Sequence, residues 1–124
     1  MTARDLQSRH QQWYKGKGLD GFCPLGPCIV TKDELPDPQD LRLRLRVNGE
    51  TKQDASTGDM IFSVAQLIAA WSLGMTLEPG DLLMTGTPSG VGFARKPPQY
   101  LQPGDVVEAE IDAIGLLRNP VAAE

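Results

Sequence analysis

Hydrophobic and polar residues alternate most regularly between positions 41 and 47. The odd positions hold three leucines and Val47, and the even positions hold arginines. A period of two puts the two kinds on opposite faces and predicts a strand with one apolar face. Asn48-Gly49 favours a type I′ hairpin turn, since both central residues need a positive φ, and residues 50–55 are then the partner strand. A second alternation, over residues 107–112, predicts a last strand with an acidic face.

A spacing of three to four residues, typical of helices, occurs twice. The first instance is a polar segment over residues 1–14. The second begins at Ser63-Val-Ala-Gln66, which resembles a capping box, and ends near Gly74. Its apolar face consists of Val64, Leu67, Ile68 and Trp71.

Short apolar runs predict a buried strand over residues 28–31 and a further strand over residues 81–85. The second follows Leu77-Glu-Pro-Gly-Asp81, and a similar Leu101-Gln-Pro-Gly-Asp105 precedes the last strand. We interpret these as two uses of one turn rather than a structural repeat, whose period would be longer. Together the elements predict short strands and two helical segments in one domain.

The amino-acid composition supports short strands and turns, and it excludes some classes of binding partner. Gly and Pro supply 23 of 124 residues, about 19% against roughly 12% in an average protein, which favours turns and short strands over a helical bundle. The net charge of −4 argues against nucleic acid and anionic membranes as partners. No apolar run approaches the ~20 residues of a membrane span. The polar N-terminal residues 1–12 do not resemble a signal peptide. Because only two cysteines occur, we expect a cytoplasmic protein with both thiols reduced.

Two loops could carry chemistry. In Gly86-Thr-Pro-Ser-Gly90, glycines allow backbone amides to converge on an anion, while Thr87 and Ser89 add hydroxyls; the alternative is a tight turn without a ligand. In Lys15-Gly-Lys17-Gly, an ammonium group could hold a carboxylate or take part in proton transfer; the alternative is a solvated basic loop.

Other candidate groups have plainer alternatives. Glu108 and Glu110 would share one strand face, as metal ligands would, but a solvated face explains them equally. Cys23 and Cys28 lack two further zinc ligands; a disulfide remains possible, although Cys28 fits an apolar strand interior. His10, the single histidine, is either a base or a surface residue of the first helix.

These segments together resemble the fumarylacetoacetate hydrolase family. The match covers essentially the whole chain, in the family's order, and its specificity lies in that joint order rather than in any single motif. The matching pieces are Thr2–Gln7, Trp13–Gly18, Phe22–Pro27, Val47–Glu50, Asp59–Phe62, Leu77–Asp81, Thr85–Gly92, Pro103–Asp105, Ile114–Gly115 and Arg118–Val121.

The resemblance implies a mixed, mainly β roll with one or two helices, which forms a homodimer. It also implies a substrate among small 2-oxo and diketo acids, whose carbon–carbon bonds the family hydrolyses or which it isomerises or decarboxylates. The family uses a divalent cation, usually Mg²⁺, with Mn²⁺ or Ca²⁺ as alternatives, as a Lewis acid and template.

Matched motifs also imply site residues. Lys17 corresponds to the family's catalytic-loop lysine, which would stabilise a developing enolate. Thr87 corresponds to the threonine that holds the substrate carboxylate, together with Gly86 and Ser89. Arg4 and Gln7 correspond to residues beside the metal and substrate.

The sequence departs from the family at the metal. The resemblance implies a Glu-x-Glu pair from an upstream strand and an Asp immediately before Met1, so no metal ligand is expected within residues 1–124. We therefore expect a partial catalytic domain whose activity belongs to a longer or reassembled protein and which is inactive in isolation. The alternatives are a non-catalytic, dimerising homologue and a metal-free carboxylate-binding module.

Overall fold

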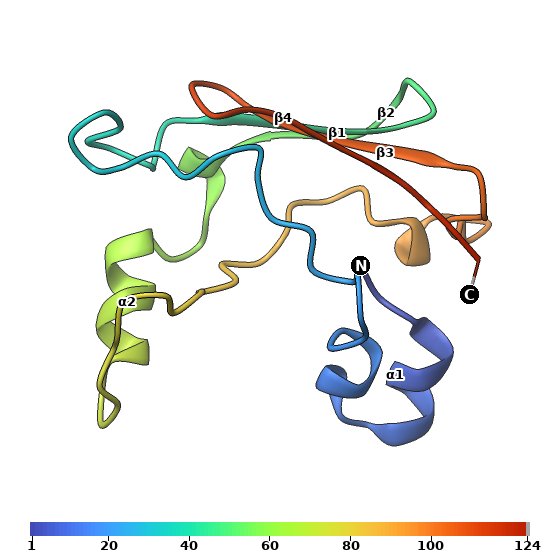
Figure 1. Cartoon of the computed structure of the whole chain (residues 1–124), viewed down its shortest axis with the longest axis horizontal. Helices are drawn as coiled ribbons and strands as arrows, with labels where there is room; N and C mark the ends of the chain where they lie inside the picture. Colours follow the sequence, from blue (N-terminus) through green and yellow to red (C-terminus); the bar gives the residue numbers. More distant parts are fainter. Residues whose placement is uncertain (124) are drawn as a thin grey trace.

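Four strands form one antiparallel sheet in a computed structural model that describes residues 1–123 (Figure 1). The strand order is β2-β1-β3-β4, and two α-helices lie apart from the sheet, which confirms the mixed, mainly β fold. The strands are β1 (Arg42–Val47), β2 (Glu50–Ser56), β3 (Val106–Ile111) and β4 (Gly115–Pro120). The helices are α1 (Arg4–His10) and α2 (Val64–Trp71), with single 3-10 turns η1 (Trp13–Gly16), η2 (Thr57–Asp59) and η3 (Gly92–Ala94).

The hairpin of β1 and β2 has the predicted turn. Asn48 and Gly49 have φ angles of 52° and 80°, as a type I′ turn requires. The register shifts between Leu45, which pairs with Gln53, and Arg46, which pairs with Thr51. Lys52 is therefore the extra residue of a β-bulge, a feature that bends a strand and increases its twist.

Strand β4 was not predicted from the sequence. Its residues, Gly-Leu-Leu-Arg-Asn-Pro, show no alternation of apolar and polar positions. It pairs only with β3, so it is an edge strand, and an edge tolerates a proline that cannot donate to a neighbour. Pairing with β3, rather than its own pattern, makes this segment a strand.

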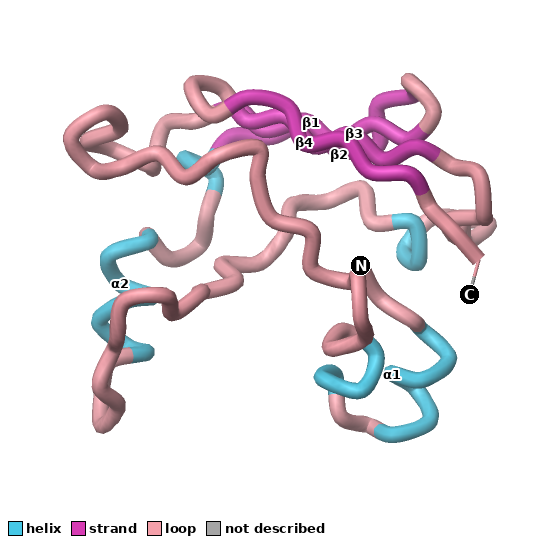
Figure 2. Tube along the Cα trace, in the orientation of Figure 1, coloured by secondary structure: helices cyan, strands magenta, loops and turns pink. Residues whose placement is uncertain are grey.

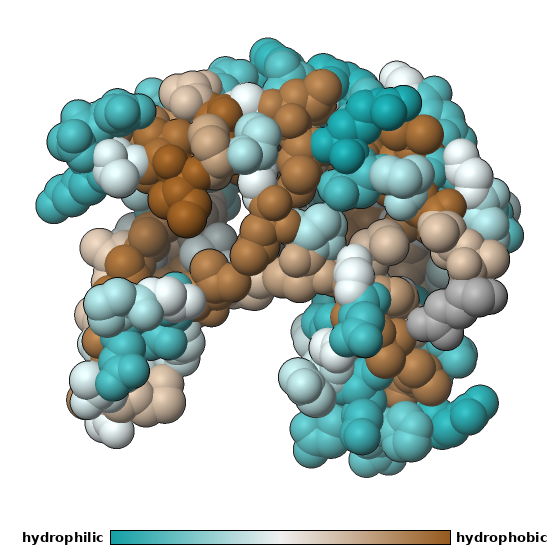
Figure 3. Space-filling view, in the orientation of Figure 1, coloured by the Kyte–Doolittle hydropathy of each residue, from teal (hydrophilic) through white to brown (hydrophobic). Residues whose placement is uncertain are grey.

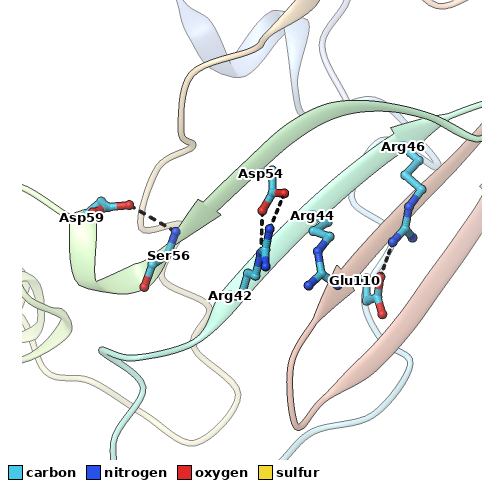
Figure 4. A network of polar contacts seen from close by, with 7 residues as sticks. All are labelled: Arg42, Arg44, Arg46, Asp54, Ser56, Asp59 and Glu110. Carbon is cyan, nitrogen blue, oxygen red and sulfur yellow. Dashed lines mark hydrogen bonds and ion pairs between the residues drawn. The ribbon is translucent and has the colours of Figure 1, made fainter.

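Charged residues cover one face of the sheet, as the alternation predicted (Figure 4). Arg42 forms a two-bond pair with Asp54, with nitrogen–oxygen distances of 2.8 and 2.7 Å. On the neighbouring strand, Glu110 accepts a 2.6 Å bond from Arg46 and lies 3.6 Å from Arg44. Cross-strand pairs of opposite charge support the register of the sheet.

The apolar face of the sheet is only partly covered. Among the described residues, Leu41 is the one buried hydrophobic side chain and Gln53 the one buried polar side chain. The accessible surface is 9347 Å², whereas a compact chain of 13.5 kDa exposes roughly 6,500 Å². Figure 3 shows apolar residues along the hollow below the sheet. The core is therefore thin for a chain of this length.

The prediction of strands over residues 28–31 and 81–85 is wrong. Both segments are irregular and pair with no strand among the described residues. Ile29 and Met84 are 93% and 66% exposed, and Cys28 is exposed with a free thiol rather than part of a core. An apolar run becomes a strand only when a partner satisfies its backbone groups, and no described residue does so here.

The two helices stand on separate limbs below the sheet (Figure 2). Helix α2 has the predicted capping box, in which Ser63 accepts from the amide of Gln66 and Gln66 accepts in return from Ser63. The Gln39 amide anchors this limb: its oxygen accepts from the Val64 amide, and its nitrogen donates to the Thr57 carbonyl at 3.0 Å. No helix within residues 1–123 is long and apolar enough to cross a membrane.

The ion pairs on the charged face predict a dependence of stability on acid. Bonds from Arg42 and Arg46 lower the pKa of Asp54 and Glu110, respectively, below the ordinary values of 3.8 and 4.5. Their stabilisation is complete above the pKa of the unfolded chain and is lost as pH falls through the folded-state pKa. We expect the melting temperature to fall below about pH 4. Thermal unfolding followed by circular dichroism between pH 7 and pH 3 measures it.

The variant Glu110→Gln should depend less on pH over this range than the native chain. Glu34→Gln, on an exposed loop, is the control and should keep the native pH profile. An unchanged profile for Glu110→Gln would contradict this explanation.

Candidate functional site

A buried glutamine holds the loop of residues 86–90, which we call the Thr87 loop. The side-chain nitrogen of Gln53 lies 3.0 Å from the Thr87 hydroxyl, 2.9 Å from the Pro88 carbonyl and 3.2 Å from the Ser89 carbonyl. Gln53 is 8% exposed and pairs with Leu45 across the hairpin, so it lies on the apolar face of the sheet. Gln53 was not predicted from the sequence, because β2 (ETKQDAS) carries no large apolar side chain that would mark its buried side. The available signal is its position opposite Leu45 in the hairpin.

The far end of the Thr87 loop is fixed to the β-bulge. Arg95 donates to the Gly90 carbonyl at 3.3 Å and to the Lys52 carbonyl at 3.0 Å. Gly90 has a φ of 104°, and a Cβ atom there would lie 2.1 Å from the Lys52 oxygen. Only glycine allows the two backbones to approach this closely. The loop is therefore held to β2 at both ends.

The Thr87 loop forms one wall of an open pocket of about 400 Å³. Gly86 and Thr87 line it, whereas Ser89 lies outside the lining and contributes its carbonyl to Gln53. The other walls are mainly apolar and come from β1, the turn η2 and the start of the α2 limb. They include Leu43, Thr57, Met60, Ile61, Phe62 and Leu67.

Lys17 lies on a second, separate part of the molecule. Its ammonium group donates to the Thr2 hydroxyl at 2.8 Å. The adjacent Gly16 is buried against the start of α1, where a Cβ atom would lie 2.7 Å from the Ala3 carbonyl oxygen. Burial, and next the charge of Lys17, lower the pKa of the Met1 amino group. This close packing fixes the backbone beside Lys17, while the lysine side chain stays exposed.

Arg4 and Gln7 meet one turn apart on α1. Arg4 donates to the Gln7 side-chain oxygen at 2.8 Å, and its guanidinium lies 5.0 Å from the centre of the Phe93 ring. This cation–π contact joins α1 to the turn that follows the Thr87 loop. Since Arg4 donates to the Gln7 oxygen, the side-chain nitrogen of Gln7 points the other way and can donate to another group. Thr2 and Arg4 also line a second open pocket, of about 640 Å³.

The predicted site residues thus form two groups. Lys17, Arg4 and Gln7 surround the start of α1, whereas Thr87 and Gly86 line the first pocket. No hydrogen bond or ion pair joins the groups within residues 1–123. The groups are connected through the contact of Arg4 with Phe93 and the short segment from Phe93 back to Gly90.

The donor set of the described residues does not fit a divalent cation. Within residues 1–123, no three His, Cys, Asp or Glu side chains come together as a metal site would require. Glu108 and Glu110 instead pair with Arg118 at 3.3 Å and Arg46 at 2.6 Å, which supports the solvated-face interpretation. The single histidine, His10, is exposed at the end of α1.

Comparison with known proteins identifies the family. Residues 1–122 match the description "Fumarylacetoacetate (FAA) hydrolase C-terminal". The chain belongs to the fumarylacetoacetate hydrolase family. The resemblance carried by the short motifs is thereby confirmed.

Three members of this family indicate what the chain is similar to. "Oxaloacetate tautomerase YisK" of Bacillus subtilis is 51% identical over 121 residues, which are 98% of this chain and 40% of the relative. A fumarylacetoacetate hydrolase from Exiguobacterium antarcticum has a solved structure with a TM-score of 0.96 and 54% identity, over 99% of this chain and 44% of that one. Maleylpyruvate hydrolase from Sphingobium, solved with manganese(II) and pyruvate, has a TM-score of 0.79 and 38% identity, over 91% of this chain and 40% of that one.

The chain therefore spans about two fifths of the length of the relatives that it matches. The similarity is nonetheless continuous across it. Names among the relatives include bacterial and mitochondrial proteins, so the expected cytoplasmic location stays a prediction.

The close approach at Gly90 yields a test of the loop's attachment. Gly90→Ala introduces both backbone strain and a clash with Lys52, whereas Gly80→Ala introduces strain alone, because Gly80 has a similar φ of 103° with nothing within 4 Å. We expect Gly80→Ala to cost about 1–3 kcal/mol of unfolding free energy and Gly90→Ala to cost about 1–3 kcal/mol more. Urea unfolding measures both. Equal losses in the two variants would refute the attachment.

Proposed function

We propose that this chain provides the carboxylate-binding side of an enzyme that acts next to the carbonyl of a small 2-oxo acid. Keto–enol tautomerisation of an oxaloacetate-like acid is the first candidate reaction, and hydrolysis of an acylpyruvate-like diketo acid is the second. The observation that carries the proposal is the 51% identity, over 98% of the chain, with a relative named oxaloacetate tautomerase. The family resemblance alone did not separate isomerisation from carbon–carbon cleavage.

Both reactions build negative charge on the oxygen of the 2-oxo group. In tautomerisation, water or another base takes a proton from the carbon beside the carbonyl, the carbon–hydrogen electron pair forms the carbon–carbon double bond, and the carbonyl π pair moves onto the oxygen. Protonation of this enolate oxygen then gives the enol. A nearby ammonium group stabilises that oxygen. Lys17 suits this role, because Thr2 accepts from its ammonium group and two further N–H groups remain free to donate.

The Thr87 loop is proposed to hold the substrate carboxylate. Thr87 is exposed at the pocket wall and carries a hydroxyl. Gly86, with a φ of 104°, gives the backbone a conformation in which successive amides can face one anion. Ser89, outside the lining of the pocket, supports the loop through its carbonyl bond to Gln53. Arg4 and Gln7 are proposed to lie at the opposite end of the substrate, with the Gln7 amide as a donor.

We propose that the complete enzyme uses a divalent cation, Mg²⁺ first, with Mn²⁺ or Ca²⁺ as alternatives. The support comes from the relative that holds manganese(II) together with pyruvate. Since the described residues do not fit such an ion, no step of the chemistry is assigned to it here. A metal-free carboxylate-binding module is the second candidate function, because Thr87 and Lys17 are present without a cluster of ligands.

Oxalate, a planar analogue of a 2-oxo acid enolate, tests the binding residues. We expect Thr87→Val and Lys17→Met each to weaken oxalate binding by about ten-fold, as loss of one hydrogen bond or charge contact would. Thr87→Ser should retain binding, and Lys15→Met, on the same exposed loop, should match the native chain. Titration calorimetry measures the affinities. Unchanged binding in Thr87→Val would contradict the assigned carboxylate site.

The same titration separates the two candidate functions. Binding that requires Mg²⁺ favours the enzyme over the metal-free module, whereas full affinity in EDTA favours the module.

We also propose that the protein acts as a homodimer. The large exposed surface supports this, because it exceeds that of a compact chain by roughly 2,800 Å² per chain, or about 5,600 Å² for two chains, at the upper end of what obligate dimers bury. Sedimentation velocity should give twice the 13.5 kDa mass of the chain. A single monomeric species at micromolar concentration would contradict the dimer.

A further inference from the structure

The orientation of the Gln53 amide is determined by its partners. Two of them, the Pro88 and Ser89 carbonyls, can only accept hydrogen bonds. The nitrogen of Gln53 must therefore face the Thr87 loop, and its two N–H groups serve three acceptors, one bond being shared. The third acceptor is the Thr87 hydroxyl oxygen, 3.0 Å away.

This arrangement fixes the polarity of the Thr87 hydroxyl. A hydroxyl has one proton to donate and two lone pairs to accept. Because Gln53 donates to the oxygen, the hydroxyl proton must point away from Gln53. Thr87 is exposed and lines the pocket, whereas Gln53 is buried behind it. The hydroxyl is thus left as a donor on the pocket side.

We propose that Gln53 is a positioning residue that presents the Thr87 hydroxyl, as a hydrogen-bond donor, to a carboxylate in the pocket. This inference rests on the proposed function, because it assumes that Thr87 meets the substrate carboxylate. Gln53 itself does not touch the ligand. It requires an acceptor as the partner of Thr87, and so favours an ionised carboxylate over a group that can only donate, such as an ammonium.

The fold holds Gln53 firmly enough for this role. Its partner across the hairpin, Leu45, belongs to the central strand, which is paired on both sides. The residue before Gln53, Lys52, is the bulge residue whose carbonyl accepts from Arg95. Arg95 in turn binds the Gly90 carbonyl at the end of the same loop. Two successive residues of β2 therefore hold the Thr87 loop. Gln53 binds it directly, and Lys52 is linked to its last residue, Gly90, through Arg95.

A double-mutant cycle on oxalate binding tests the inference, with the whole 124-residue chain and Mg²⁺ present. Gln53→Met keeps the length of the side chain but removes its hydrogen-bond donors. Gln53→Glu replaces the amide with a carboxylate, which has acceptors but no donor when it is ionised. We expect Gln53→Met to weaken binding several-fold and Gln53→Glu to weaken it by about ten-fold or more. Gln102→Met, at an exposed turn, is the matched control and should bind as the native chain does.

The decisive variant is Gln53→Met combined with Thr87→Val. If Gln53 acts through the Thr87 hydroxyl, the double variant binds no more weakly than Thr87→Val alone, because the group that Gln53 orients is gone. Additive losses would overturn the inference and indicate a merely structural glutamine. If Thr87→Val binds normally, or if the native chain binds no oxalate, the proposed function fails instead.

Backbone nitrogen-15 relaxation tests the positioning without a ligand, because the amides of this loop donate no hydrogen bond to the described residues. In Gln53→Met, we expect lower order parameters for residues 86, 87, 89 and 90, with those of β1 and β3 unchanged. Native order parameters throughout the loop would overturn the inference even if oxalate binding fell. Lower order parameters across the whole sheet would also overturn it, since Gln53 would then serve the sheet rather than the loop.

Discussion

The antiparallel pairing of β1 with a strand on each side is the constraint on which the rest of the molecule depends. Its register places arginines opposite carboxylates on one face and leucines on the other. A slip by one residue would exchange the two faces of the strand. It would also carry Gln53 to the solvent side, away from the loop that it holds. The cross-strand ion pairs and the buried glutamine thus stabilise the same register of the sheet.

The sequence predicted those parts of the fold in which a local pattern and a tertiary partner agree. The β1–β2 hairpin, the Asn48-Gly49 turn and the capping box at Ser63 are examples. The segments over residues 28–31 and 81–85 have apolar runs but no partner strand among the described residues, so the pattern misled. Strand β4 is the reverse case, since it has a partner but no pattern. Even the repeated turn shows this: Asp81 and Asp105 accept from amides in the same way, yet only the second turn leads into a strand.

The candidate site was predictable at the level of motifs but not of assembly. Thr87 and Lys17 were identified by their family motifs, and the structure gives each a defined local environment. The support beneath them was not visible in the sequence, because Gln53 and Arg95 act across sequence separations of about 35 and 43 residues. Nor could any pattern show that Arg4 and Thr87 line separate pockets. A sequence motif shows which chemical groups are present. The distance between two such groups depends on tertiary packing, which a motif does not encode.

The order of the strands also has a consequence for how the protein folds. Strands β1 and β2 form one local hairpin and β3 and β4 another, but joining the hairpins closes a loop of about 60 residues, which costs far more chain entropy than either turn. The Thr87 loop belongs to that long connection and is tied back to β2 through Gln53 and Arg95. Those ties shorten the remaining loop to about 15 residues and so lower the entropy still to be lost when β3 docks. The residues that shape the pocket would then also speed the last step of sheet assembly.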